Sequence, residues 1–297
     1  MKHAFFMIFS LVCLLPAPVR ANDDAKLVLH LKQLYGVWRH SMVTKNPNNW
    51  KKYTSQLSQI NVRNRLWSER RRFPEGVFSA PVAPPDIQTL KVLRVRVNKN
   101  TAKSVYYGKV DFGVGGEPTD NLFVVSYIKE ATGWKYHGGE FVNLNQLPQV
   151  RAEIAKGDLK FVDHPDFIPD GILPKPPIAI TGPAKYIAKV YVYCPGREVS
   201  VIGNGISRHL FQNDKGAEIL IGGAKDGKNT LQYTIKDIPG GDPKAPMTIR
   251  MYLMSEVQGN KPLKPLEYQI ENGEKPKASG TMSFVMTPEM EVHLKGK

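Results

Sequence analysis

The sequence predicts an α+β protein with three N-terminal helices on a curved antiparallel sheet, a proline-rich linker and a C-terminal all-β sandwich. Three observations support this fold class. Apolar residues recur at helical spacing over the first 70 residues, strict alternation begins near residue 93, and the last third of the chain consists of short strand patterns separated by turns. The chain has 297 residues, with 25 glycines and 23 prolines. Because that length is too great for one small core, we expect two domains.

Residues 1–21 are predicted to be a secretory signal peptide rather than part of the fold. Lys2 precedes the apolar run AFFMIFSLVCLL, and small residues at the cleavage positions end at Ala21. The run is too short to span a bilayer, which takes about 20 apolar residues. Leu11 and Val12 are too large to precede Cys13 in a lipoprotein cleavage site. We therefore expect a periplasmic or secreted protein, cut after Ala21, with no integral membrane segment.

The chain is strongly basic, with 41 Lys and Arg, 27 Asp and Glu, and a net charge of +14. Without Lys2 and Arg20 of the signal peptide, 39 basic residues stand against the same 27 acidic ones, so the net charge is +12. In an exported protein this charge favours an anionic glycan or envelope polymer as the partner, and not nucleic acid. The alternative is that the charge serves solubility alone. The sequence leaves the oligomeric state unknown.

Three helices are expected before residue 73. The first carries its apolar side chains on one face, at Leu27, Leu31, Leu34, Tyr35, Trp38 and Met42. Asn46 and Pro47 predict the N-cap and first residue of a second, short helix. A third helix is expected from about residue 55 to residue 72, ended by Phe73 and Pro74.

The hydrophobic period then changes to that of a sheet, with strands expected at residues 93–98, 102–112, 122–129 and 134–137. Three glycines, at positions 113, 115 and 116, lie between two of these strands. A dinucleotide loop would lead into a helix and would have a glycine where Pro118 stands, and a Walker loop would contain Gly-Lys-Ser/Thr. The glycines are therefore interpreted as a hairpin turn, and no cofactor is expected.

Three helices followed by a meander of long strands that closes on the sequence GWKY (residues 133–136) resemble the nuclear-transport-factor-2-like cone fold, which includes ketosteroid-isomerase-like enzymes. The resemblance covers about residues 23–144. It implies that the helices lie against a curved sheet and can enclose a pocket. The family includes non-catalytic binding domains as well as enzymes. This chain departs from the family's element order because it lacks an evident strand between the second and third helices.

The remaining residues predict a linker and a second domain. A short helix is expected at residues 148–156, with Gly157 as its C-cap. Residues 162–183 contain six prolines and are predicted to be a stiff, extended linker.

Sandwich strands, immunoglobulin-like or C2-like, are expected at residues 188–194, 199–202, 218–221, 231–235, 247–254 and 282–286. Cys194, the only mature thiol, alternates with inward residues and is interpreted as a buried free cysteine. The expected domains are residues 22–161 and 184–297.

Arg63, Trp67, Arg70 and Arg71 lie in the densest basic region and form the first candidate binding site. Arg63 and Arg70 are seven residues apart, which places them on one side of a helix with Trp67 between them. Guanidinium groups bind sulfate, phosphate and carboxylate, and the indole adds a stacking surface. The alternative is that Trp67 belongs to the core and the arginine side chains extend into solvent.

Tyr106, Asp111, His137 and Glu140 are the candidates for a pocket inside the cone, if the domain is an enzyme or a carrier. A buried carboxylate beside a tyrosine is the chemistry that an isomerase of this type requires. Asp111 also lies beside the expected hairpin, where a solvated acid is ordinary. The histidines are dispersed, so no metal site is predicted.

These features favour an exported, non-catalytic protein that binds or scaffolds at the cell envelope and recognises an anionic glycan or envelope polymer. The alternative is a cone-domain enzyme or small-molecule carrier that uses an interior pocket. An open interior lined by Asp111 or His137 with Tyr106 would favour the alternative. An interior filled by aromatic side chains would favour the non-catalytic protein.

Overall fold

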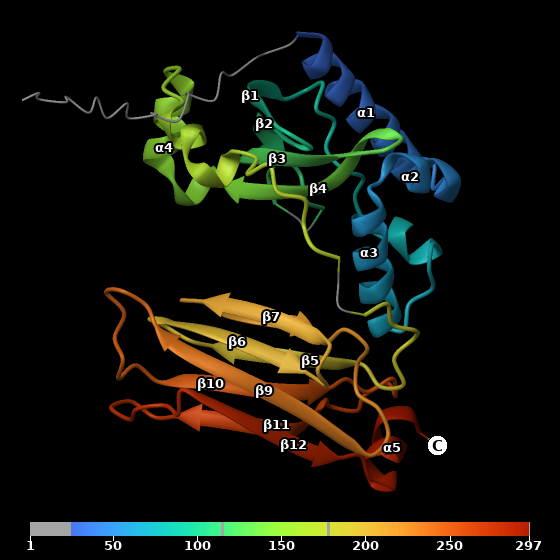
Figure 1. Ribbon diagram of the computed structural model, residues 1–297, viewed down its shortest axis with the longest axis vertical. Helices are drawn as coiled ribbons and strands as arrows, with labels where there is room; N and C mark the ends of the chain where they lie inside the picture. The colour runs from blue at the N-terminus through green and yellow to red at the C-terminus, as the bar shows by residue number, and fades with distance from the viewer. Residues whose placement is uncertain (1–24, 114–115, 177–178, 297) are drawn as a thin grey trace, which may run out of the picture.

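The computed structural model describes residues 25–113, 116–176 and 179–296 (Figure 1). Within these residues the chain combines helices with three four-stranded sheets, in which the paired strands are antiparallel. The predicted signal peptide and its cleavage position lie outside the described residues.

The three N-terminal helices are α1 (Ala25–Val43), α2 (Pro47–Tyr53) and α3 (Gln56–Ser68). Asn46 caps α2 by accepting from the amide of Asn49, and Ser55 caps α3 by accepting from the amide of Ser58. The expected end of the third helix at residue 72 is wrong, because α3 ends at Ser68. Two residues further on, Arg70 has a left-handed φ of 55°, which a helix cannot continue through.

The first sheet is a meander of β1 (Lys91–Asn98), β2 (Thr101–Val110), β3 (Thr119–Glu130) and β4 (Gly133–Asn143), in that spatial order. The predicted glycine turn does connect two strands, β2 and β3. Gly113 and Gly116 adopt φ angles of 65° and 90°, a region that glycine enters without steric cost. Since a strand rather than a helix follows them, these glycines do not form a nucleotide-binding loop.

Both faces of this sheet are covered. On one face α1 and α2 bury an aromatic cluster that includes Tyr35, Trp38, Trp50, Tyr106, Phe123 and Tyr127. The short 3-10 helix η1 (Glu75–Phe78) packs beside it. The opposite face packs against α4 (Pro148–Ala155) and the 3-10 helices η2 (Leu144–Gln146), η3 (Lys160–Asp163) and η4 (Pro165–Phe167).

The proline-rich segment is not an extended linker along its whole length. Val162 and Phe167 are buried against the first sheet, and Asp163 pairs with Arg94 and Arg96 of β1. The side-chain amide of Asn98 donates to the carbonyl of Pro169 at 3.1 Å. The first part of the segment therefore packs on the N-terminal part of the molecule, because two of its apolar residues complete that core.

The C-terminal strands are β5 (Ala188–Tyr193), β6 (Arg197–Gly203), β7 (Ser207–Gln212), β8 (Lys215–Ile219), β9 (Lys228–Asp237), β10 (Met247–Leu253), β11 (Leu263–Ile270) and β12 (Ser279–Val285), followed by helix α5 (Pro288–Lys295). They form two sheets, in the orders β11-β10-β5-β8 and β12-β9-β6-β7. Side chains from both sheets share one hydrophobic core. Cys194 is free and fully buried in that core, which confirms its interpretation from the sequence.

The last turn of α3 contacts the C-terminal part directly (Figure 1). Asn64 donates to the carbonyl of Ala179 at 3.0 Å and accepts from the amide of Thr181 at 3.2 Å. The hydroxyl of Ser68 accepts from the amide of Gly222 at 2.8 Å. Because Asn64 and Ser68 are both almost fully buried, these hydrogen bonds are shielded from water. We call the contacts of Asn64, Trp67, Ser68 and Arg70 with residues 179–256 the α3 anchor.

Replacing Asn64 by Ala should lower the free energy of unfolding. The change leaves the amide of Thr181 and the carbonyl of Ala179 without their partner, and each such buried group costs about 1–3 kcal/mol. Asn61→Ala, one turn earlier at an exposed position of α3, is the matched control and should change stability by less than about 0.5 kcal/mol. Urea unfolding of both variants tests this. Equal midpoints for the two variants would show that the anchor does not stabilise the fold.

Candidate functional site

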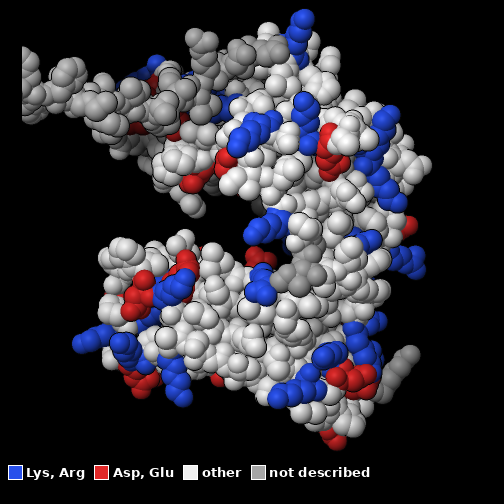
Figure 2. All heavy atoms as spheres, viewed as in Figure 1, with Lys and Arg blue, Asp and Glu red and all other residues white. Residues whose placement is uncertain are grey.

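A cleft of about 590 Å³ lies between the N-terminal and C-terminal parts. One wall comes from α3, through Asn61, Asn64 and Arg65. The opposite wall comes from β7 and β8 and the residues beside them, and part of the proline-rich segment completes the lining. Figure 2 shows that the surface is hollowed between the two parts.

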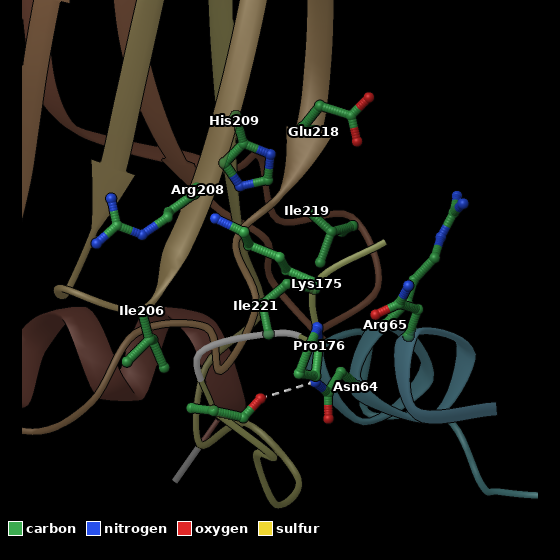
Figure 3. A pocket seen from close by; sticks show the side chains of 12 residues that line it. Asn64, Arg65, Lys175, Pro176, Ile206, Arg208, His209, Glu218, Ile219 and Ile221 are labelled. Carbon is green, nitrogen blue, oxygen red and sulfur yellow. Dashed lines mark hydrogen bonds between the residues drawn. The ribbon is translucent and has the colours of Figure 1, made fainter. Parts of the chain in front are cut away.

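The floor of the cleft is apolar and its edge is basic. Three half-buried isoleucines form the floor, at Ile206, Ile219 and Ile221. Lys175 and Arg208 supply positive charge, and among the described residues no carboxylate lies within 4.0 Å of either one. Figure 3 shows the Lys175 side chain extending toward Arg208 and His209. An apolar surface with a few convergent polar groups is typical of a ligand site.

The other two charged residues of the cleft differ from this pair. Arg65 is bound to Glu69 at 3.1 Å, one helical turn further along α3. Its guanidinium and the carboxylate of Glu218 point away from Lys175 in Figure 3. Lys175 and Arg208 are therefore the cations of the cleft that remain available to a ligand.

His209 is fixed at the wall of the cleft by Ser207. The two side chains are 2.7 Å apart, between the serine Oγ and the histidine Nε2. Because that Oγ also accepts from the amide of Ile221 at 2.7 Å, the serine hydroxyl is free to donate to a neutral imidazole. Burial lowers the pKa of His209, although the carboxylate of Glu218 opposes the shift. His209 is therefore a neutral group at pH 7 and adds no charge to the cleft.

The predicted basic site does not form as one surface. The guanidinium carbon of Arg63 lies 5.0 Å from the centre of the Trp67 ring, as expected for stacking. Arg70, however, donates to the carbonyls of Ala184 and Lys185 and pairs with Glu256 at 2.9 Å. The expectation that Arg63 and Arg70 share one side of a helix is wrong, because α3 ends before Arg70.

Arg71 is also engaged within the chain. Its guanidinium pairs with Glu69 at 3.1 Å and donates to the carbonyl of Gly76 at 3.0 Å. Trp67 is half-buried, in edge contact with Phe73. Of the four residues predicted for the basic site, Arg63 and Trp67 lie together, and Arg63 forms no ion pair within the part of the chain that the structure describes.

The four pocket candidates do not converge. Tyr106 is buried in the aromatic cluster, and burial raises its pKa. Asp111 is exposed and accepts from the amide of Gly113 at 2.7 Å, as turn residues do. His137 is 2.8 Å from the hydroxyl of Ser55, whose oxygen caps α3. Glu140 is exposed and lines a separate hollow beside η3. No acid–base pair of the expected kind is therefore assembled from them.

A second hollow, of about 300 Å³, opens at one end of the first sheet. Its lining is aromatic and proline-rich, and Asp111 is the one pocket candidate among its residues. Trp38 stacks on Tyr136 with ring centres 3.6 Å apart, and Phe123 stacks on Phe141 at 4.6 Å. The indole N–H of Trp38 is buried and has no hydrogen-bond partner among the described residues. Aromatic rings thus form much of the lining of this hollow.

The described residues contain neither a metal-binding cluster nor a membrane-spanning helix. Within residues 25–113, 116–176 and 179–296, no group of three His, Cys, Asp or Glu side chains is placed to hold a metal ion. None of the helices described is both long enough and apolar enough to cross a membrane.

Comparison with known protein families, curated proteins and solved structures finds no match for this chain. The resemblance of residues 23–144 to the nuclear-transport-factor-2-like fold therefore stays a prediction.

Sequence reasoning missed the residues that make the cleft basic. Lys175 stands among four prolines of a segment interpreted as a linker, at positions 169, 174, 176 and 177. Arg208 lies on β7, a strand that was not expected. Its alternation of Ser207, His209 and Phe211 on one side with Arg208 and Leu210 on the other is the signal that could have revealed the strand.

Because His137 and His209 are partly buried, we expect the protein to lose stability in mild acid. Burial lowers the pKa of both imidazoles below the ordinary value of 6.5, with Glu130 and Glu218 opposing it. The unfolded chain then binds protons at a higher pH than the folded chain. Stability is therefore fully present above about pH 6.5 and falls as the pH drops through the folded pKa values.

Urea unfolding at about pH 7.5 and about pH 5.5 measures this loss. His209→Gln should lose less stability between the two pH values than the unmodified protein. His30→Gln, at an exposed position of α1, is the control and should match the unmodified protein. A His209→Gln variant with the full pH dependence would exclude His209 as its source.

Proposed function

We propose that this chain is an exported, non-catalytic binding protein of the cell envelope that holds an anionic glycan or envelope polymer in the cleft. The observation that carries the proposal is a pair of cations at the edge of a concave surface, Lys175 and Arg208, which have no carboxylate partner among the described residues. Guanidinium and ammonium groups without an internal partner attract sulfate, phosphate and carboxylate groups. The net charge of +12 that remains without Lys2 and Arg20 of the signal peptide increases the encounter rate with such ligands.

The architecture behind this function is a cone domain, a proline-rich linker and a β-sandwich of the immunoglobulin-like or C2-like kind. The meander of β1 to β4 with α1 to α3 supports the cone domain. Two sheets around one core support the sandwich. The linker is then shorter than residues 162–183, since Val162 and Phe167 belong to the first core.

Export is supported by the N-terminal sequence, with its apolar run and a cleavage position after Ala21. The non-catalytic character is supported by the separation of Tyr106, Asp111, His137 and Glu140, which lie in different surroundings. The ligand is then bound by electrostatic attraction and by the shape of the cleft. Because salt screens the attraction, a higher salt concentration favours release of the ligand.

The double variant Lys175→Gln/Arg208→Gln should weaken binding of a sulfated oligosaccharide at least about tenfold, the factor that corresponds to 1.4 kcal/mol. Lys225→Gln/Lys228→Gln is the matched control, because it removes the same charge from exposed positions away from the cleft. Binding to the unmodified protein should also weaken with salt, since the Debye length falls from about 10 Å at 0.1 M to about 3 Å at 1 M. Isothermal titration calorimetry measures all three affinities.

The control decides between a site and diffuse charge. An equal loss of affinity in both double variants would mean that net charge alone attracts the glycan and that the cleft is not its site. No binding by the unmodified protein would contradict the proposed function. A circular-dichroism melt of each variant verifies that the fold is intact.

The aromatic hollow supports a second candidate function, that of a small-molecule carrier. The supporting observation is the aromatic and proline-rich lining of the hollow, which includes Pro84, Phe123 and Phe141 and suits an apolar ligand. A Cβ atom at Gly139 would lie 2.8 Å from the Phe123 ring, so any larger residue there must fill the hollow or displace its wall.

A neutral apolar probe, N-phenyl-1-naphthylamine, tests the carrier function by its fluorescence. Gly139→Ala should abolish probe binding, because the added methyl group would clash with the ring of Phe123 and force that wall of the hollow to shift. Gly138→Ala, where a Cβ atom meets nothing within 4 Å, is the neighbouring control and should bind normally. If the probe binds both variants equally, its binding site lies outside the hollow.

A further inference from the structure

The floor of the cleft is an apolar surface, and a ligand made of sugars alone has no apolar chain to pack against it. Ile206, Ile219 and Ile221 come from three separate positions around β7 and β8, and all three are left half-buried. Pro176 and Ala179 extend the same apolar surface on the side of the proline-rich segment. Apolar area left in contact with water is unfavourable in proportion to its size. A concave surface of this composition gains most from a ligand that has an apolar portion.

The floor is fixed in place by hydrogen bonds at its margins. The amide of Ile221 donates to the hydroxyl of Ser207 at 2.7 Å. The next amide, that of Gly222, donates to Ser68 of α3 at 2.8 Å. The backbone that carries Ile221 is therefore tied both to β7 and to the N-terminal part. A preformed floor spares a ligand the entropic cost of ordering it.

The two cationic groups of the cleft lie near each other (Figure 3). In Figure 3 the amine of Lys175 extends toward Arg208 and His209, while Ile219 lies to the right of the lysine side chain and Ile221 lies below it. Arg65 and Glu218 point in other directions. Separate apolar and cationic regions in one cavity match a ligand that is itself divided in the same way. The volume of the cleft, about 590 Å³, is in the range of pockets that bind small molecules.

We infer that the ligand of this cleft is an amphiphilic anion, with a phosphate or carboxylate head bound by Lys175 and Arg208 and an apolar chain lying on Ile206, Ile219 and Ile221. The inference rests on the proposed function, because it takes the cleft as the binding site, and it names the chemical class of the ligand. Arg208 offers the planar pair of donors that fits a phosphate or carboxylate, and Lys175 adds a point charge.

Isothermal titration calorimetry with alkyl phosphates of six, eight and ten carbons, each below its micelle concentration, tests the apolar contact. Affinity should rise with each added methylene by up to about fourfold, and inorganic phosphate should bind at least tenfold more weakly than decyl phosphate. Decanoate, compared with decyl phosphate, distinguishes a carboxylate head from a phosphate head. Affinities that do not change with chain length would overturn the inference without any need for a variant.

Two variants test where the apolar chain and the anionic head of the ligand bind. Ile219→Ser should weaken decyl phosphate at least tenfold and leave a sulfated oligosaccharide unchanged, whereas Lys175→Gln/Arg208→Gln should weaken both. Ile180→Ser is the control, because Ile180 is an isoleucine with 61% of its surface exposed that does not line the cleft. An equal effect of Ile219→Ser and Ile180→Ser on decyl phosphate would contradict the predicted contact.

The same titrations separate the inference from the proposed function. If the oligosaccharide binds through Lys175 and Arg208 while decyl phosphate binds no better than inorganic phosphate, the proposed function stands and the amphiphilic ligand is excluded. If neither the oligosaccharide nor any alkyl phosphate binds, both are contradicted.

Discussion

The α3 anchor is the contact on which the arrangement of this molecule depends. Asn64 fixes the chain at Ala179 and Thr181, and the carbonyl of Trp67 accepts from the amide of Ala184 at 2.9 Å. The hydroxyl of Ser68 accepts a hydrogen bond from the amide of Gly222, which belongs to the C-terminal part. Because these partners are backbone groups, their positions do not depend on flexible side chains of the second part. One helical turn thus fixes how the two parts face each other.

The cleft follows from this anchor. Its walls are α3 on one side and β7 with β8 on the other; Val62 of α3 packs on the first core, and Phe211 of β7 belongs to the second. A continuous series of contacts runs from Ser68 through Gly222 and Ile221 to Ser207 and His209. A change at the anchor would therefore alter both the shape of the floor and the position of the cations. Binding and the stability of the interface are expected to be linked for the same reason.

Sequence patterns predicted the elements with strong periodicity and failed where the pattern was weak or a tertiary contact decided the outcome. The first helix and the meander were evident because their apolar residues alternate with the correct period. The end of α3 was misplaced because the arginine run that follows Ser68 is compatible with a helix. Strand β11 contains Pro265, which argues against a central strand, and it is tolerated here because β11 lies at a sheet edge. The cleft itself brings together residues more than 100 positions apart, which no local pattern reveals.

Hydrogen–deuterium exchange at the amides of Thr181, Ala184 and Gly222 tests the anchor most directly, because each of these amides donates across the contact. The structure predicts that all three are protected to a similar degree and that Asn64→Ala accelerates exchange at Thr181 first. Exchange of all three at the rate of an unprotected loop in the native protein would contradict a fixed arrangement of the two parts, and with it a preformed cleft.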